Sequence, residues 1–197
     1  MVKKASMCMI SAVVFWVGAA SGASLETTSN GQVTRYAKGQ YNAGEHYREQ
    51  SVNRFTNPDG TTPVSGDVVL DRLTGLIWTK DGKTPGPTTC SPAESKTWQS
   101  AHDYVVCLNA AGYLGYSDWR LSSVQELKSL VNGNQRNSAE WLNKQGFNDV
   151  QASYYWSSSV DEVQKSNAMC VGMAVGGVYA GPKAYDTFFA WPVRSGQ

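Results

Sequence analysis

Several short apolar runs along the chain predict short β-strands. Val68-Val69-Leu70 and Leu76-Ile77-Trp78 stand on either side of the turn-like stretch 71–75. Two β-rich runs separated by turn residues predict a strand, a turn and a second strand. Gly176-Gly177 supplies a further hairpin turn in a second block of strands late in the chain. That block consists of short runs at 154–157, 168–175, 178–179 and 188–193.

Between the two strand blocks the apolar positions recur at helical spacing. Thr97 is expected to cap a helix with the apolar face Trp98, Ala101, Tyr104, Val105 and Leu108. Ser123 followed three residues later by Glu126 is a capping-box signature for a second helix. Trp141-Leu142 is assigned to a short third turn. The order of strands, two helices and then strands predicts an α+β domain with short twisted antiparallel strands.

The first 23 residues have the layout of a signal peptide. Lys3 and Lys4 precede an apolar stretch from Met7 to Ala20, and the small residues 21–23 follow it. An uncleaved anchor is the alternative interpretation, but the stretch is short for a bilayer span. We therefore expect a secreted or periplasmic protein with no stable membrane span after signal removal.

The region that follows the signal peptide divides in two. Residues 24–64 are rich in Ser, Thr, Asn, Gly and Gln and lack periodic apolar positions, which predicts a largely irregular leader. Pro63 helps to mark its end, and residues 65–197 are expected to form the domain.

Charge argues against polyanionic partners. The chain has a formal net charge of +1, and loss of the two lysines of the signal peptide turns this to about −1. Nucleic acids and sulfated polysaccharides are captured mainly by basic excess and counterion release. We therefore expect that the protein has no nucleic-acid partner.

Three cysteines remain after the signal peptide, which carries Cys8. An odd count in an exported protein leaves one thiol unpaired or paired between chains. Cys90 and Cys107 flank one loop and a helix start, so they are the expected disulfide. Cys170 lies in an apolar run and is expected to be a buried, unreactive thiol. No cysteine pair has metal-ligand spacing.

A set of tryptophan-containing phrases, taken in order, resembles the Lcl C-terminal domain family, once called a domain of unknown function. The resemblance covers about 68–194. It rests on Thr74 to Trp78, on Trp98 with Ala101 and Cys107, on Gly115 to Leu121 with Glu126-Leu127, on Tyr155 to Ser158, and on Trp191 to Arg194.

The resemblance implies a C-type-lectin-like fold related to the formylglycine-generating enzyme and the sulfatase-modifying group. The family has Pro-Thr after the Arg-Leu pair, whereas Ser122-Ser123 stands here; serine caps a helix as well as threonine does. A well-known member of the family forms the C-terminal domain of a collagen-like adhesin and binds sulfated glycans. This chain has no Gly-X-Y stretch and no basic excess to hold sulfate. It also lacks the Glu-Pro-Asn or Gln-Pro-Asp calcium loop of sugar-binding C-type lectins.

Residues for catalysis are scarce. His46 lies in the leader, and His102 on the first helix is adjacent to Asp103, so their side chains point in different directions. A His102–Cys107 nucleophile pair is the alternative to the disulfide. A copper oxygenase would need two cysteines in the C-terminal part, where only Cys170 lies. We expect no catalytic residues, no metal and no cofactor.

The charged residues of the motifs have two interpretations. Asp118, Arg120 and Arg194 either contact a ligand or form a structural network in which arginine packs on tryptophan and pairs with a carboxylate. The structural interpretation is favoured, and it extends to the other motif residues. The expected structural set is Trp78, Trp98, Asp118, Trp119, Arg120, Glu126, Trp156, Trp191 and Arg194.

A ligand surface is expected on the loops and strands after Asn132, where tyrosines stand near small polar residues. These aromatic residues are equally compatible with a core role. The candidates are Tyr154, Tyr155, Tyr179, Tyr185 and Phe188. The expected function is non-catalytic binding of a surface glycan or an envelope protein. The alternatives are a degenerate enzyme of the sulfatase-modifying group and a structural module of an envelope assembly. By analogy with the family, an oligomer is also compatible with the sequence.

Overall fold

The computed structural model describes residues 24–27, 32–36 and 50–196, and the chain divides into two compact units, residues 1–52 and 53–197. The expected signal peptide, residues 1–23, lies outside the described residues. Short strands interrupt the segment predicted to be irregular. They are β1 (Ser24–Thr27), β2 (Gln32–Tyr36) and β3 (Gln50–Asn53), which form a three-stranded sheet in the order β1-β2-β3.

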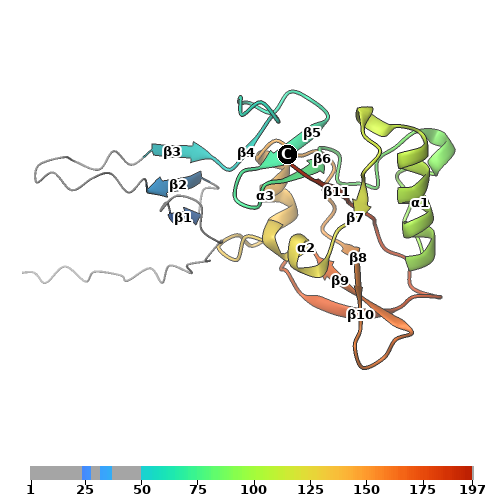
Figure 1. The fold of residues 1–197 in the computed structure, drawn as a ribbon. Helices are drawn as coiled ribbons and strands as arrows, with labels where there is room; N and C mark the ends of the chain where they lie inside the picture. The colour runs from blue at the N-terminus through green and yellow to red at the C-terminus, as the bar shows by residue number, and fades with distance from the viewer. Residues whose placement is uncertain (1–23, 28–31, 37–49, 197) are drawn as a thin grey trace, which may run out of the picture. The chain divides into compact units, whose positions relative to one another are not determined.

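The second unit contains a five-stranded antiparallel sheet in the order β4-β5-β6-β11-β7 (Figure 1). Its strands are β4 (Phe55–Thr56), β5 (Val68–Asp71), β6 (Leu76–Thr79), β7 (Arg120–Leu121) and β11 (Pro192–Ser195). The two strands predicted around the turn at 71–75 are β5 and β6, and they pair as a hairpin. The last strand of the second unit, β11, thus lies inside the sheet, between β6 and β7.

The compact unit begins at Asn53, earlier than the boundary expected at residue 65. Phe55 pairs with Asp71 through β4 and is 4% exposed. Its ring also packs edge-on against Trp141 and Phe147. Residues 53–64 therefore belong to the domain, because one strand and one aromatic side chain bind this polar segment to it.

A second antiparallel sheet has the order β10-β9-β8. It consists of β8 (Tyr154–Val160), β9 (Asn167–Gly172) and β10 (Val178–Pro182). Gly176, with a φ of +77°, lies in the turn between β9 and β10, as the glycine pair predicts. The segment around Phe189 runs along the free side of β8, where Trp156 N donates to Phe189 O at 2.9 Å.

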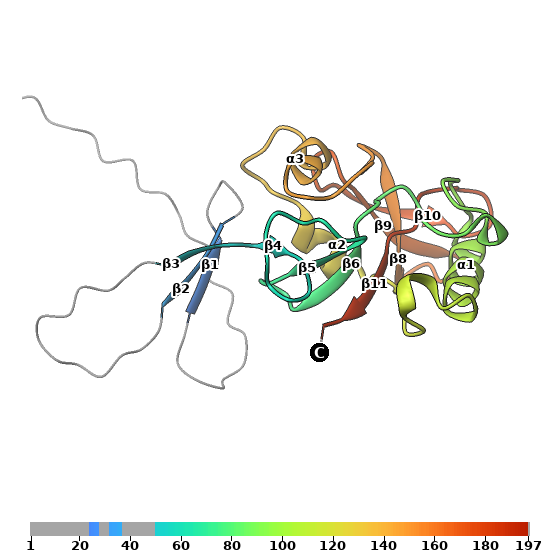
Figure 2. The same cartoon turned by 90° about the horizontal axis from the view of Figure 1, so that it is seen from above.

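Three α-helices complete the unit: α1 (Trp98–Ala110), α2 (Val124–Leu130) and α3 (Ser138–Lys144). Short 3-10 turns, η1 (Thr88–Cys90) and η2 (Tyr113–Gly115), flank α1. Thr97 and Ser123 cap α1 and α2 as expected, and the turn assigned to Trp141-Leu142 is the full helix α3, capped by Asn137. In both views α1 lies apart from α2 and α3 (Figure 1, Figure 2).

The buried apolar residues form two clusters. One gathers around Trp78, Trp191 and the inner faces of α2 and α3. The other gathers around Trp119, Trp156 and the inner face of α1. The Cys90–Cys107 disulfide is present, and Cys170 is a buried free thiol, as predicted. The α+β class is confirmed, whereas the C-type-lectin-like relationship stays a prediction.

Candidate binding surface

Three aromatic side chains meet on the face of the β8-β9-β10 sheet that also carries the buried Trp156. Ring centroids lie 5.8 Å apart for Tyr154 and Tyr179, 5.4 Å for Tyr154 and Phe188, and 6.3 Å for Tyr179 and Phe188. Tyr154 is 39% exposed and Tyr179 is 43% exposed, whereas Phe188 is half-buried. We call these three residues the aromatic trio. They place two partly exposed rings on a third ring that anchors them.

Gly172 on the central strand makes room for this arrangement. Tyr154 lies opposite it in the register, and a Cβ atom on Gly172 would lie 3.3 Å from Cε1 of Tyr154. Because Gly172 has no side chain, the Tyr154 ring can lean across β9 towards Tyr179 on β10. The β9–β10 hairpin thus brings together residues that are far apart in the sequence.

The base of the trio is tied to the core. Phe188 packs on Trp156 with ring centroids 4.7 Å apart, and Trp156 is fully buried. The indole Nε1 of Trp156 donates to Lys96 O at 2.7 Å, and the backbones of Lys96 and Phe188 exchange hydrogen bonds of 2.8 and 3.0 Å. A surface supported in this way is pre-organised, which reduces the entropy lost on binding.

Asp186 gives this surface its charge. The negative charge of its carboxylate is the main reason that the pKa of the Tyr179 hydroxyl is raised, and desolvation adds to the shift. Oδ2 of Asp186, Trp156 and Phe188 all lie within about 3 Å of the position that a Cβ atom of Gly181 would occupy. Because position 181 is a glycine, the Asp186 carboxylate, Trp156 and Phe188 can all approach this point.

The five predicted ligand residues do not share one environment. Tyr154, Tyr179 and Phe188 form the trio. Tyr155 is fully buried between Phe189 and Trp191, so the expectation that it lies at a ligand surface is wrong. In a strand, neighbouring side chains point to opposite faces, so Tyr155 points into the cluster around Trp78 and Trp191, whereas Tyr154 points to the other face of the sheet. Tyr185 is 85% exposed and has no ring contact within the described part of the chain.

Most tryptophans of the motifs hold the fold together through their indole nitrogens. Trp98 donates to Ser157 O at 2.8 Å, Trp119 to Tyr113 O at 2.9 Å and Trp191 to Thr79 O at 2.9 Å. Each bond joins a buried or half-buried ring to backbone of another segment. Trp78 is buried against Trp191, and its Nε1 has no hydrogen-bond partner among the described residues.

The charged motif residues form structural pairs. Arg194 donates from Nε to Asp118 Oδ1 at 2.7 Å, and its guanidinium lies 4.1 Å from the centroid of the Tyr116 ring. The arginine therefore packs on a tyrosine, where a tryptophan was expected. The hydrogen bond from Arg194 is the main reason that the pKa of Asp118 is lowered.

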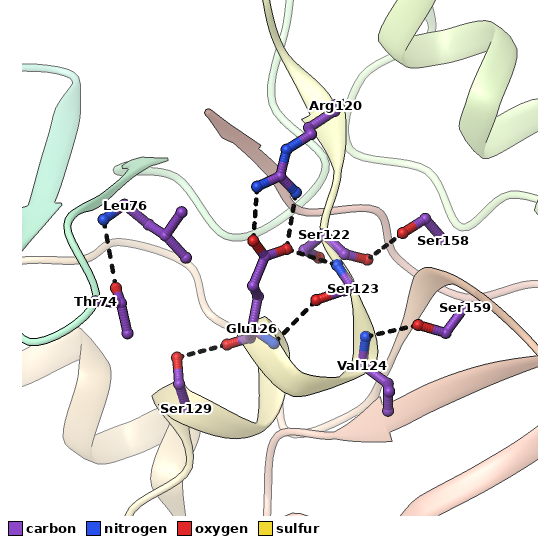
Figure 3. A network of polar contacts seen from close by, with 10 residues as sticks. All are labelled: Thr74, Leu76, Arg120, Ser122, Ser123, Val124, Glu126, Ser129, Ser158 and Ser159. Atoms are coloured by element: carbon purple, nitrogen blue, oxygen red, sulfur yellow. Dashed lines mark hydrogen bonds and ion pairs between the residues drawn. The ribbon is translucent and has the colours of Figure 1, made fainter. Parts of the chain in front are cut away.

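Arg120 and Glu126 form the centre of a polar network between β7 and α2 (Figure 3). The guanidinium donates two bonds to the Glu126 carboxylate, at 2.8 and 2.6 Å. The same carboxylate accepts from Ser123 N at 2.8 Å, while Ser159 Oγ accepts from Val124 N at 3.1 Å. Every group that the network uses is bonded inside the domain, so the network fixes the start of α2.

The candidate catalytic groups are not assembled for a reaction. His102 stacks edge-on against Trp98 at 4.2 Å, and burial lowers its pKa. Cys107 is consumed in the disulfide. The Cys170 thiol donates to Tyr179 O at 3.2 Å, and burial raises its pKa to about 12, so it is a poor nucleophile. Within the described ranges, no group of three His, Cys, Asp or Glu side chains is placed to hold a metal ion.

A family model described as the Lcl C-terminal domain matches residues 67–194 of this chain. The chain belongs to the Lcl C-terminal domain family. The match runs from the residue before β5 into β11, so it includes both sheets of the second unit except β4 and the last residue of β11. It also includes the whole aromatic trio. No curated protein matches the chain.

Membership of the Lcl C-terminal domain family identifies the domain and leaves its ligand open. Sequence reasoning found the trio members but missed Asp186 and Gly172. Asp186 could have been found from sequence, because it is an acidic residue between two of the candidate aromatic residues, Tyr185 and Phe188. Nothing in the sequence marks Gly172 as the space over which Tyr154 leans. In the part of this Lcl C-terminal domain protein that is described, no helix has both the length and the apolar character to traverse a bilayer.

Proposed function

We propose that this domain is a non-catalytic recognition module of an exported bacterial protein and that it binds a surface glycan through the aromatic trio. The observation that carries the proposal is the pair of rings, Tyr154 and Tyr179, exposed by 39% and 43% on a buried aromatic base. Tyrosine offers a rigid apolar face and a polar hydroxyl, which suits the apolar faces and hydroxyl groups of a sugar. The alternative ligand is an envelope protein.

Two further observations support this proposal. The disulfide favours an oxidising compartment, secreted or periplasmic. The motif arginines and carboxylates are engaged with one another, so they do not support the alternative of a degenerate enzyme of the sulfatase-modifying group. The exposed trio also favours recognition over a purely structural role in an envelope assembly.

A glycan-array screen of the full chain tests this function. The array is run with and without calcium and at two salt concentrations, and the double variant Tyr154→Ala/Tyr179→Ala is compared with the parent chain. We expect binding to a defined glycan class that does not depend on calcium and that the double variant loses.

Glu162→Gln is the control, because Glu162 is exposed in the β8–β9 turn, away from the trio residues in sequence. A blank array from folded protein would overturn the glycan proposal and direct the search to protein partners. Binding that survives the double variant would place the site elsewhere on the domain.

A further inference from the structure

The charge beside the aromatic trio is negative and uncompensated. Asp186 takes part in none of the ion pairs of the described residues, which join Arg54 to Asp71, Arg120 to Glu126 and Arg194 to Asp118. The lysine closest to it in the sequence, Lys183, is engaged elsewhere. Its ammonium lies 4.4 Å from the Trp98 ring centroid and donates to Lys165 O at 2.8 Å.

The faces of aromatic rings are also electron-rich and attract cations. A carboxylate beside Tyr179 therefore adds to the attraction that Tyr154 and Tyr179 already exert on a positive group. The same carboxylate opposes a sulfate or a uronic acid, because two negative charges repel when they are close together. The charge of this surface therefore favours a cationic ligand over an anionic one.

We infer that the trio and Asp186 select glycans that carry free amines, such as polymers of de-N-acetylated hexosamine. This inference rests on the proposed glycan-binding function and specifies its ligand class. An amino sugar offers an apolar ring face to Tyr154 and Tyr179 and an ammonium group to Asp186. An N-acetylated sugar offers the same ring without the charge.

The position of Asp186 supports this assignment. Its Oδ2 lies close to Gly181, at the point that Trp156 and Phe188 also approach, so the carboxylate stands at the base of the trio. Its charge reaches the Tyr179 hydroxyl, whose pKa it raises. An ammonium group at the edge of the Tyr179 ring is therefore attracted by this carboxylate as well as by the ring.

The experiment compares two oligosaccharides of equal length by calorimetry with the full chain: a glucosamine oligomer and its N-acetylated form, at a pH where the amines are protonated. We expect the amine form to bind about fivefold more tightly. Asp186→Asn should remove this preference by weakening binding of the amine form, so that the two oligomers bind about equally. Glu162→Gln, which removes the same charge from the exposed β8–β9 turn, should keep the preference.

The aromatic part is tested separately. Tyr179→Ala should weaken binding of both forms by about tenfold, because it removes the stacking face, whereas Tyr179→Phe should keep most of the affinity. Near-ultraviolet circular dichroism of each variant verifies that the domain remains folded.

The possible failures are distinguishable. Equal affinity for the two oligomers, unchanged in Asp186→Asn, would overturn the charge selection and leave glycan binding intact. Binding of sulfated glycans alone, lost in Tyr179→Ala, would do the same. A domain that binds no glycan of any class would overturn both this inference and the proposed function.

Discussion

At the scale of single residues, Arg54 and Asp71 form an ion pair that is buried on both sides. Their side chains are 4% and 0% exposed, and two hydrogen bonds of 2.8 and 2.6 Å join them. Arg54 also donates to Ser129 O at 2.8 Å, which connects β4 and β5 to α2. A buried charge is tolerated only while its partner is present.

Removal of one partner should therefore destabilise the domain strongly. Arg54→Met leaves Asp71 buried without compensation, and we expect the free energy of unfolding to fall by about 3–5 kcal/mol in urea titrations. The double variant Arg54→Met/Asp71→Leu removes both charges, so its free energy of unfolding should fall by less than that of the single variant. Arg136→Met, at an exposed position, is the control. If Arg54→Met were as stable as Arg136→Met, the Arg54–Asp71 ion pair would not be needed for the stability of the domain.

The residues that sequence reasoning placed well are those whose partners are close in the chain. Thr97, Ser123 and Glu126 were identifiable as caps because a cap bonds to groups two or three residues away. Arg54 was missed because its partner is 17 residues distant and its third acceptor is 75 residues distant. Asp186 was missed for a related reason, since its role depends on β10 folding back beside it.

At the scale of elements, α2 depends on one carboxylate for its first turn. Glu126 completes the capping box with Ser123 and also holds Arg120 of β7. Burial acts to raise the pKa of Glu126, but the hydrogen bonds from Arg120 and Ser123 outweigh it, and the pKa is lowered from its ordinary value of 4.5.

This shift predicts how stability depends on pH. A carboxylate whose pKa is lower in the folded state contributes its full stabilisation above the unfolded pKa, here 4.5, and loses it as the pH falls towards the folded pKa. Glu126→Gln should therefore lower the free energy of unfolding at neutral pH by about 1 kcal/mol. Below pH 4.5 the difference between the variant and the parent chain should shrink.

Urea titrations at a series of pH values measure this difference, and Glu162→Gln serves as the control. The free energy of unfolding of Glu126→Gln should still depend on pH to some extent, because hydrogen bonds also lower the pKa of Asp118 and of Asp59. A difference between variant and parent that stays constant across the acidic range would contradict the assignment.

Elements with a strong local period were predictable from sequence, whereas those defined by pairing were not. The face of α1, with Ala101, Tyr104, Val105 and Leu108 buried, follows the predicted spacing. Phe55–Thr56, by contrast, forms only a two-residue strand in a polar segment, and it exists because β5 offers an edge. Whether such a short strand forms depends on the neighbouring strands in the fold, and composition alone does not predict it.

At the scale of the whole molecule, the domain is assembled from segments that are distant in sequence. The last strand, β11, lies between β6 and β7. The trio likewise draws on β8, β10 and the segment after β10. A list of exposed tyrosines could be proposed from sequence, but the division into one buried, one isolated and three clustered aromatic residues required the fold.

The disulfide acts at this same scale, because it closes the long loop that precedes α1. Cys90 and Cys107 are 17 residues apart, and the loop between them leads into the helix that covers the second apolar cluster. Closing a loop of this length restricts the unfolded chain and contributes about 3 kcal/mol in the chain-entropy treatment. Reduction should lower the free energy of unfolding by about this amount in urea titrations with and without a thiol reductant.

Two variants assign the effect to this bond. The double variant Cys90→Ala/Cys107→Ala should match the reduced parent chain and no longer respond to reductant. Cys170→Ala should keep the full response, because the Cys170 thiol is free and buried. If the parent chain kept its stability after mass spectrometry had shown Cys90 and Cys107 to be reduced, the loop would be held by its packing alone. Its stability would then come from contacts such as the hydrogen bond that Tyr104 donates to Pro85 O.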